Sequence, residues 1–170
     1  MATAINSLTI SASVGWDTTN VLDLSTAHDK ATLSYTDSLT DGTSADQCKM
    51  VWHDQGTIAS GGSAAIDVAG SLTDAFGNSA VFTKIKGIML LNKGVASGSS
   101  FTETSGENII TSTSTLTSAS HAAPLEPGGV MLFTSPKVGG TVTASSADTI
   151  TLSRAGSSTV TYQIVIWGLL

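Results

Sequence analysis

The side chains best suited to metal or acid–base chemistry are aspartates and histidines in the first third of the chain. Three aspartates recur within the segment DSLTDGTSAD, namely Asp37, Asp41 and Asp46. Oxygen-rich loops of this kind can hold calcium. The spacing is not that of an EF-hand, and aspartate and glycine are equally typical of a solvated turn. A calcium site and an ordinary turn therefore stay open as alternatives, and we assign no metal ligand.

Nucleophilic catalysis would need a serine or cysteine held beside a histidine, with the nucleophile on a sharp turn. The three histidines, His28, His53 and His121, lie in separate segments. The sequence Gly61-Gly62-Ser63 lacks the Gly-x-Ser-x-Gly spacing of a nucleophile elbow. We therefore expect a protein that is not an enzyme, with no catalytic residue and no cofactor.

Tryptophans on one exposed β-face would indicate stacking on sugar rings. The chain has three, Trp16, Trp52 and Trp167. Trp52 shares its parity with Met50 in KMVWHD, and Trp167 follows Ile166 at the end of an apolar segment. Both patterns favour packing or an interface. A carbohydrate-binding module stays an alternative function.

Composition narrows the classes of partner. The 170 residues suffice for one domain, and the net charge of −6 comes with seven scattered basic residues, which argues against nucleic-acid binding. No apolar run approaches the ~20 residues of a membrane helix, and the N-terminus lacks the pattern of a signal peptide. The lone cysteine, Cys48, excludes an intrachain disulfide. We expect a protein that folds in a reducing cytoplasm and binds no membrane.

The surface should be rich in hydroxyl groups. Charged residues make up only 12% of the chain, whereas it has 25 serines and 25 threonines. Burying a hydroxyl costs far less than burying an ion. Such a surface suits a protein that spends its life packed against neighbours.

Apolar and hydroxyl residues alternate along most of the chain, which is typical of antiparallel strands with one buried face. Helix formers are rare, and Gly, Ser and Asp turns separate the segments. We predict strands over residues 7–14, 21–24, 31–35, 48–53, 64–68, 79–82, 85–91, 108–112, 130–134, 140–144, 149–153 and 159–167. The predicted fold class is an all-β antiparallel β-sandwich of the jelly-roll type, with an up-and-down barrel as the alternative.

The last third of the chain predicts most of the core. Its apolar residues share one parity within each strand and should lie on one buried face. They are Val130, Leu132, Ile150, Leu152, Val160, Tyr162, Ile164 and Ile166.

Three segments resemble small β-rich proteins of tailed-bacteriophage virions. They are SLTDAFGNSAVFTKIKGIMLLNKG (71–94), EPGGVMLFTSP (126–136) and ASSADTITLSRAGSSTVTYQIVIWG (144–168). Proteins of this kind have an Asp-x-Phe-Gly-Asn turn before a strand, a Pro-Gly-Gly before an apolar strand, and a C-terminal hairpin with Asp-x-Ile. The resemblance covers about 60% of the chain, from residue 66 onward, and rests on turns and strands.

The resemblance implies a jelly-roll capsid decoration (cement) protein, assembled in the host cytoplasm and bound to the outer surface of the virion head. Its partners would be the major capsid protein and further copies of itself, as a homotrimer or homodimer. A tail or fibre component that contacts the host surface is the alternative within the virion.

We expect residues 1–14 to form an N-terminal arm or a first strand, and residues 15–170 to form one β-sandwich domain. Apolar residues near both ends have no obvious strand partner and are the expected interface residues. They are Ile5, Leu8, Ile10, Trp167, Leu169 and Leu170. The competing interpretation is that both ends complete the domain's own sheets.

Overall fold

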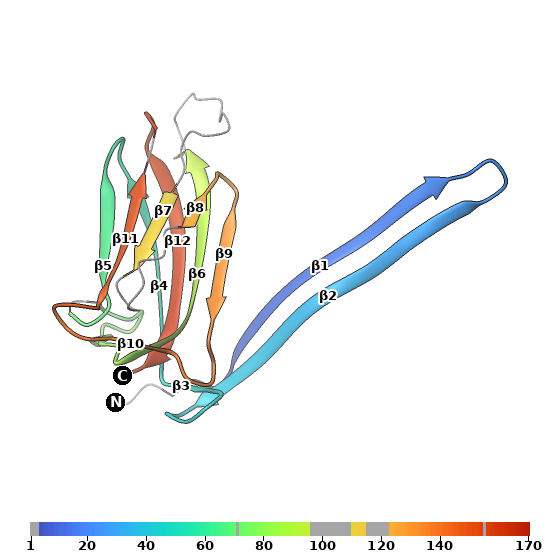
Figure 1. The fold of residues 1–170 in the computed structure, drawn as a ribbon. Helices are drawn as coiled ribbons and strands as arrows, with labels where there is room; N and C mark the ends of the chain where they lie inside the picture. Colours follow the sequence, from blue (N-terminus) through green and yellow to red (C-terminus); the bar gives the residue numbers. More distant parts are fainter. Residues whose placement is uncertain (1–3, 71, 96–109, 115–122, 155) are drawn as a thin grey trace.

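The chain forms a β-sandwich from which one long β-hairpin projects (Figure 1). The computed structural model describes residues 4–70, 72–95, 110–114, 123–154 and 156–170. Within these ranges the protein is all-β and almost entirely antiparallel, as predicted. No helix long and apolar enough to cross a membrane occurs in the described part of the chain.

One sheet of the sandwich has β12 (Val160–Leu169) at its centre. This strand pairs on one side with β4 (Met50–Ile58) and on the other with β6 (Lys84–Val95). The far edge of β6 pairs with two short strands, β9 (Val130–Thr134) and β10 (Gly140–Thr141). β12 is therefore an inner strand.

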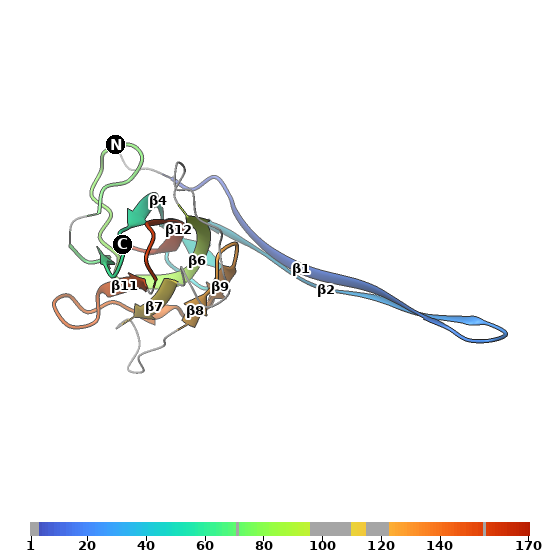
Figure 2. The same cartoon turned by 90° about the horizontal axis from the view of Figure 1, so that it is seen from above.

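The second sheet has the order β5-β11-β7-β8. Its strands are β5 (Ser63–Asp67), β11 (Thr149–Arg154), β7 (Ile110–Ser114) and β8 (Ala123–Leu125). Seen from above, the sandwich has two layers: β11, β7 and β8 form the lower one in Figure 2, and β4, β12, β6 and β9 form the upper one. Two pairs of consecutive strands, β7 with β8 and β9 with β10, stay within one sheet. Every other connection between the described strands from β4 to β12 passes to the opposite sheet.

The main core lies between the two sheets and contains six of the eight predicted core residues. Those six are Ile150, Leu152, Val160, Tyr162, Ile164 and Ile166, all at most 5% exposed. The prediction for β9 was wrong. Val130 is 53% exposed, and Leu132 packs outside the sandwich, whereas Met131 between them packs against the core. β9 is an edge strand whose side chains face the opposite sides from those predicted. Met131 points toward the core, and Val130 and Leu132 point away from it.

Other predicted strands also need correction. Of residues 140–144 only Gly140–Thr141 form a strand, with an isolated bridge at Thr143. Residues 79–82 form no strand, apart from an isolated bridge at Ser79, although Ala80 and Phe82 are buried. Apolar residues therefore enter this core from an irregular segment as well. Of the predicted strand 108–112, residues 108 and 109 lie outside the described residues, and β7 begins at Ile110.

The projecting hairpin consists of β1 (Leu8–Val21) and β2 (Thr26–Asp41), which we call the hairpin arm. Its strands pair without a break from Leu8↔Leu39 to Val21↔Thr26. The three short strands predicted over 7–14, 21–24 and 31–35 are thus parts of one ribbon and its turn. At ~3.4 Å per residue, the 14 residues of β1 span ~45 Å. The arm extends to residue 41 rather than ending at 14, and the sandwich follows it.

Candidate functional site

The hairpin arm has one apolar face and one hydroxyl face, because residues directly opposite in an antiparallel pair point to the same side. The pairs Ala12–Tyr35, Val14–Leu33 and Trp16–Ala31 lie on one side. The apolar face of the arm is defined as Ala12, Val14, Trp16, Ala31, Leu33 and Tyr35. Every one of these residues is exposed, with Val14 at 65% and Leu33 at 71%.

The opposite side of the arm carries hydroxyl groups and an ion pair. Ser13 faces Ser34, and Asp17 faces Lys30 with 3.3 Å between Oδ2 and Nζ. Hydroxyl and charged side chains are well solvated by water. Large exposed apolar patches, in contrast, mark interaction surfaces. The apolar face of the arm is therefore the candidate interaction surface.

The tip of the arm is apolar as well. The turn between β1 and β2 closes with a hydrogen bond from the Leu22 N–H to the Ser25 carbonyl. Val21 is 77% exposed and Leu24 is fully exposed. The tip is the part of the arm that lies farthest from the sandwich (Figure 1).

The root of the arm is fixed to the outer face of the β4-β12-β6-β9 sheet. Ile10 and Leu39 pack with Cys48 and Trp167 in a second buried cluster. Trp167 in turn lies over Gly87, where a Cβ atom would overlap its ring. The arm thus leaves the sandwich from a packed base and not from a loose linker.

Polar contacts reinforce the root. Asp41 accepts a hydrogen bond from Lys49 Nζ at 2.6 Å and another from the Ile5 N–H. The Lys49 hydrogen bond lowers the pKa of the Asp41 carboxyl below its ordinary value. Lys86, only 1% exposed, donates from Nζ to the Ser44 carbonyl at 2.6 Å, and burial lowers its pKa. These contacts tie the turn after β2 to the sandwich.

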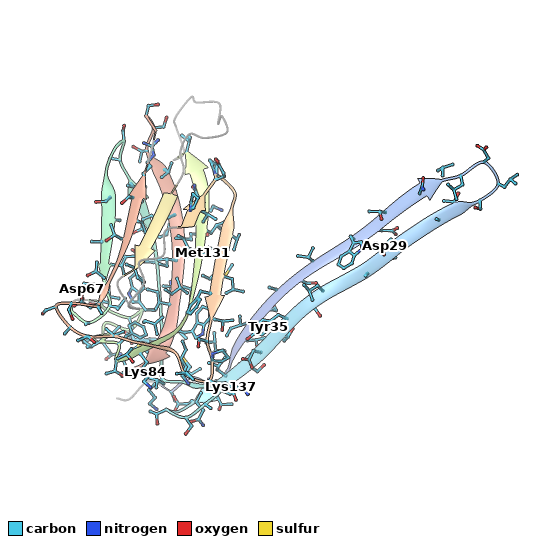
Figure 3. The ribbon with its side chains drawn as sticks, in the orientation of Figure 1. Asp29, Tyr35, Asp67, Lys84, Met131 and Lys137 are labelled. Carbon is cyan, nitrogen blue, oxygen red and sulfur yellow. The ribbon has the colours of Figure 1, made fainter. Side chains whose placement is uncertain are left out.

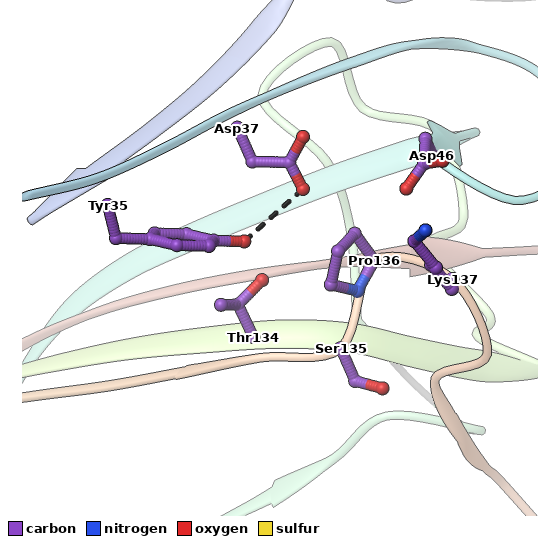
Figure 4. A pocket seen from close by; sticks show the side chains of 7 residues that line it. All are labelled: Tyr35, Asp37, Asp46, Thr134, Ser135, Pro136 and Lys137. Carbon is purple, nitrogen blue, oxygen red and sulfur yellow. Dashed lines mark hydrogen bonds between the residues drawn. The ribbon is translucent and has the colours of Figure 1, made fainter.

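An open pocket of about 590 Å³ lies beside the root. Tyr35 and Asp37 of the arm face Asp46 and the segment Thr134–Lys137 across it (Figure 4). The Tyr35 hydroxyl donates to Asp37 at 3.2 Å. No histidine or cysteine is among its lining residues, and the pocket lies where the arm diverges from the sandwich.

The outer face of the same sheet continues beyond the root as a second apolar surface. Register places Met89 opposite Leu132 and Val165, and Leu91 opposite Val130. We define the outer patch as Met89, Leu91, Val130, Leu132 and Val165. Met89 is 41% and Val130 is 53% exposed, whereas Leu132 and Val165 are half-buried against the arm root.

Four of the six expected interface residues gather at the arm root. Ile10 and Trp167 are buried there, and Ile5 and Leu8 pack against their cluster, whereas Leu169 is buried outside it. The expectation that they lack strand partners was wrong, since Ile10 pairs with Asp37 and Trp167 with Val51 and Gly87. Leu170 is 48% exposed. A role for these residues in contacting a partner stays a prediction, with Leu170 the most accessible.

The other candidate groups are dispersed. Asp41 is engaged by Lys49, whereas Asp37 and Asp46 line the root pocket. Among the described residues, no three His, Cys, Asp or Glu side chains are grouped to hold a metal ion. Trp52 and Trp167 are buried and Trp16 lies on the arm, so the tryptophans do not form an exposed row. His121 lies outside the described residues.

No family model, curated protein or solved structure matches the chain. Its function therefore has to be argued from its own geometry.

Proposed function

We propose that the protein is a structural subunit of a virus particle, a decoration protein that binds the outer surface of a tailed-phage head. The observation that carries this proposal is the hairpin arm, a ribbon ~45 Å long that exposes an apolar face and an apolar tip to water. A two-stranded ribbon of this length is marginally stable alone. It gains its stability and its use when it lies against other subunits.

The sandwich supports the same proposal. We infer that it is a jelly roll, because its eight strands other than β10 alternate between the sheets except at β7–β8, in the orders β4-β12-β6-β9 and β5-β11-β7-β8. Double-sheet jelly rolls recur in viral capsid proteins. The turns quoted in the resemblance also form: the Asp74 carboxylate accepts hydrogen bonds from the Phe76 and Asn78 N–H groups.

Within this proposal the arm tip makes the contact with the capsid. Leu22 and Leu24 are the most distant apolar side chains from the sandwich, and at 50% and 100% exposure they lose most water on insertion into a neighbour's groove. Each contact is small. Repetition over the shell gives retention that one contact does not supply.

Stoichiometry tests this placement. In purified virions, a decoration protein should be present in copy number comparable to the major capsid protein, as measured by densitometry of a stained gel. A copy number of a few to some tens per virion would favour the tail or fibre alternative, and absence from the particle would overturn the proposal.

A substitution in the tip tests the contact. The Leu22→Ser/Leu24→Ser variant should lose binding to capsids that lack the native protein, with unchanged thermal unfolding of the free chain. Asp23→Ser in the same turn is the matched control and should bind as the wild type does. Full retention of the leucine variant would exclude the tip as the anchor.

A further inference from the structure

We propose that the apolar face of the hairpin arm binds the outer patch of a second copy of this chain, so that two copies exchange arms. The inference concerns the middle of the arm and not its tip. It is independent of the proposed function, because it is a property of the free protein.

The two surfaces match in chemistry. The middle of the arm presents Val14, Trp16 and Leu33, all more than 40% exposed. The outer patch presents Met89 and Val130, also more than 40% exposed, on a sheet whose other face is buried. Both are unpartnered apolar sheet faces, and pairing them removes both from water.

The charges are complementary. The apolar side of the arm also carries Asp29 and Asp37, which stand opposite Thr18 and Ile10. They accept hydrogen bonds from Trp16 Nε1 and the Tyr35 hydroxyl, and within the described ranges neither has an ion-pair partner. The exposed Lys93 lies two residues beyond Leu91 on β6. A carboxylate on the incoming arm can therefore meet a cation beside the patch.

The arm of the same copy covers only the Leu132 and Val165 end of its patch and leaves Met89 and Val130 exposed. Its root occupies the lower end of the sheet's outer face, over Trp167, and from there the ribbon points away from the sandwich (Figures 1 and 2). Asp29 lies far out along the arm, whereas Tyr35 lies near the root (Figure 3). A second copy supplies the missing surface.

The dimensions fit an exchange. From Ala12 to Asn20 the free ribbon is ~30 Å long and ~10 Å wide, so this side covers ~300 Å², about half of it the apolar face and the rest polar residues such as Thr18 and Asp29. Counted on both partners, one contact buries ~600 Å², and two contacts related by a twofold axis bury ~1,200 Å², the lower end of specific interfaces. One contact alone is too small, so the geometry favours a reciprocal pair.

Light scattering coupled to size-exclusion chromatography of the full chain tests the proposal. The wild type should be a dimer at micromolar concentration. Val14→Thr/Leu33→Gln should raise the dissociation constant at least about tenfold, because it makes the apolar face polar. Ser13→Thr/Ser34→Gln introduces the same two side chains at the neighbouring pair on the hydroxyl face and should leave the dissociation constant unchanged.

The receiving surface is tested in the same way. Met89→Gln/Val130→Thr should weaken the dimer as the arm variant does, whereas Val81→Thr, an exposed valine outside the patch, should not. A monomeric wild type at 50 µM or higher, or an oligomer that neither variant weakens, would overturn the proposal. Because all substituted side chains are exposed, circular dichroism of each variant should match the wild type.

Discussion

Strand β12 and the hairpin arm have the same sequence pattern and opposite surroundings. In β12 the residues of one parity, such as Ile164 at 1% exposure, lie in the core. In the arm the equivalent residues, such as Val14 at 65%, lie in water. Alternation shows that a strand has one apolar face. It does not show that the same chain buries that face. In the arm the apolar face is exposed, and we interpret it as a surface for a partner.

The largest expected effect separates these two regions directly. Ile164→Ala should lower the free energy of unfolding by ~2–5 kcal/mol, because it leaves a cavity in a packed core. Val14→Ala should change it by no more than ~0.5 kcal/mol at protein concentrations where the chain is monomeric. Denaturant titration measures both. Equal losses at the two positions would show that the arm is packed in the isolated chain.

Substitutions of two glycines test the same comparison with a stability effect of intermediate size. Gly87→Ala should destabilise the protein by ~1–3 kcal/mol, because the new methyl group overlaps the Trp167 ring under the arm root. Gly15→Ala in the arm meets Thr32 Oγ1 at 3.4 Å and the Ala31 carbonyl at 4.0 Å, both ordinary contacts. It should be neutral or slightly stabilising, since alanine loses less entropy on folding. Thermal unfolding of the two variants, side by side, provides the measurement; a tolerated Gly87→Ala would contradict the packing at the root.

The smallest effect is a pH dependence at the junction of the two regions. The pKa of Asp41 is lowered in the folded state, chiefly by its hydrogen bond from Lys49. Its contribution to stability is therefore fully present above the ordinary value of 3.8 and is lost as pH falls through the folded value. Asp41→Asn should be slightly less stable than the wild type at pH 6, and the difference should shrink below pH 3.8. A difference that is constant from pH 6 to pH 2 would exclude this carboxylate as the source.

The sandwich was largely predictable from sequence because parity, β-branched residues and turn signals agree along its later strands. Residues 149–153 and 159–167 were predicted as strands and form β11 and most of β12. β9 failed because every residue in VMLFT except Thr134 is apolar, so the sequence offers no polar alternation to fix its parity. At an edge strand, tertiary pairing decides which side faces inward.

The hairpin arm was less predictable for a different physical reason. The apolar parity of Ile10, Val14 and Trp16 is visible in the sequence. Their pairing with residues 31–37 depends on an unbroken register through the tip, and the apolar Val21, Leu22 and Leu24 resembled a further strand instead of a turn. The sequence therefore led us to expect interface residues near the chain ends, and it gave no sign of the exposed apolar face in the middle of the ribbon.

The position of β12 has a consequence for how the protein is made. Its two neighbours, β4 and β6, are synthesised long before residues 160–169, and neither pairs directly with the other. Until the ribosome has translated β12, the strand between β4 and β6 is missing from this sheet. The pairing of β1 with β2, in contrast, needs only residues 8–41. The two strands of the arm can therefore pair before the domain is complete, and the packing of the arm root waits for Trp167 in β12. A chaperone that holds apolar surface until translation reaches β12 would increase the yield of folded protein.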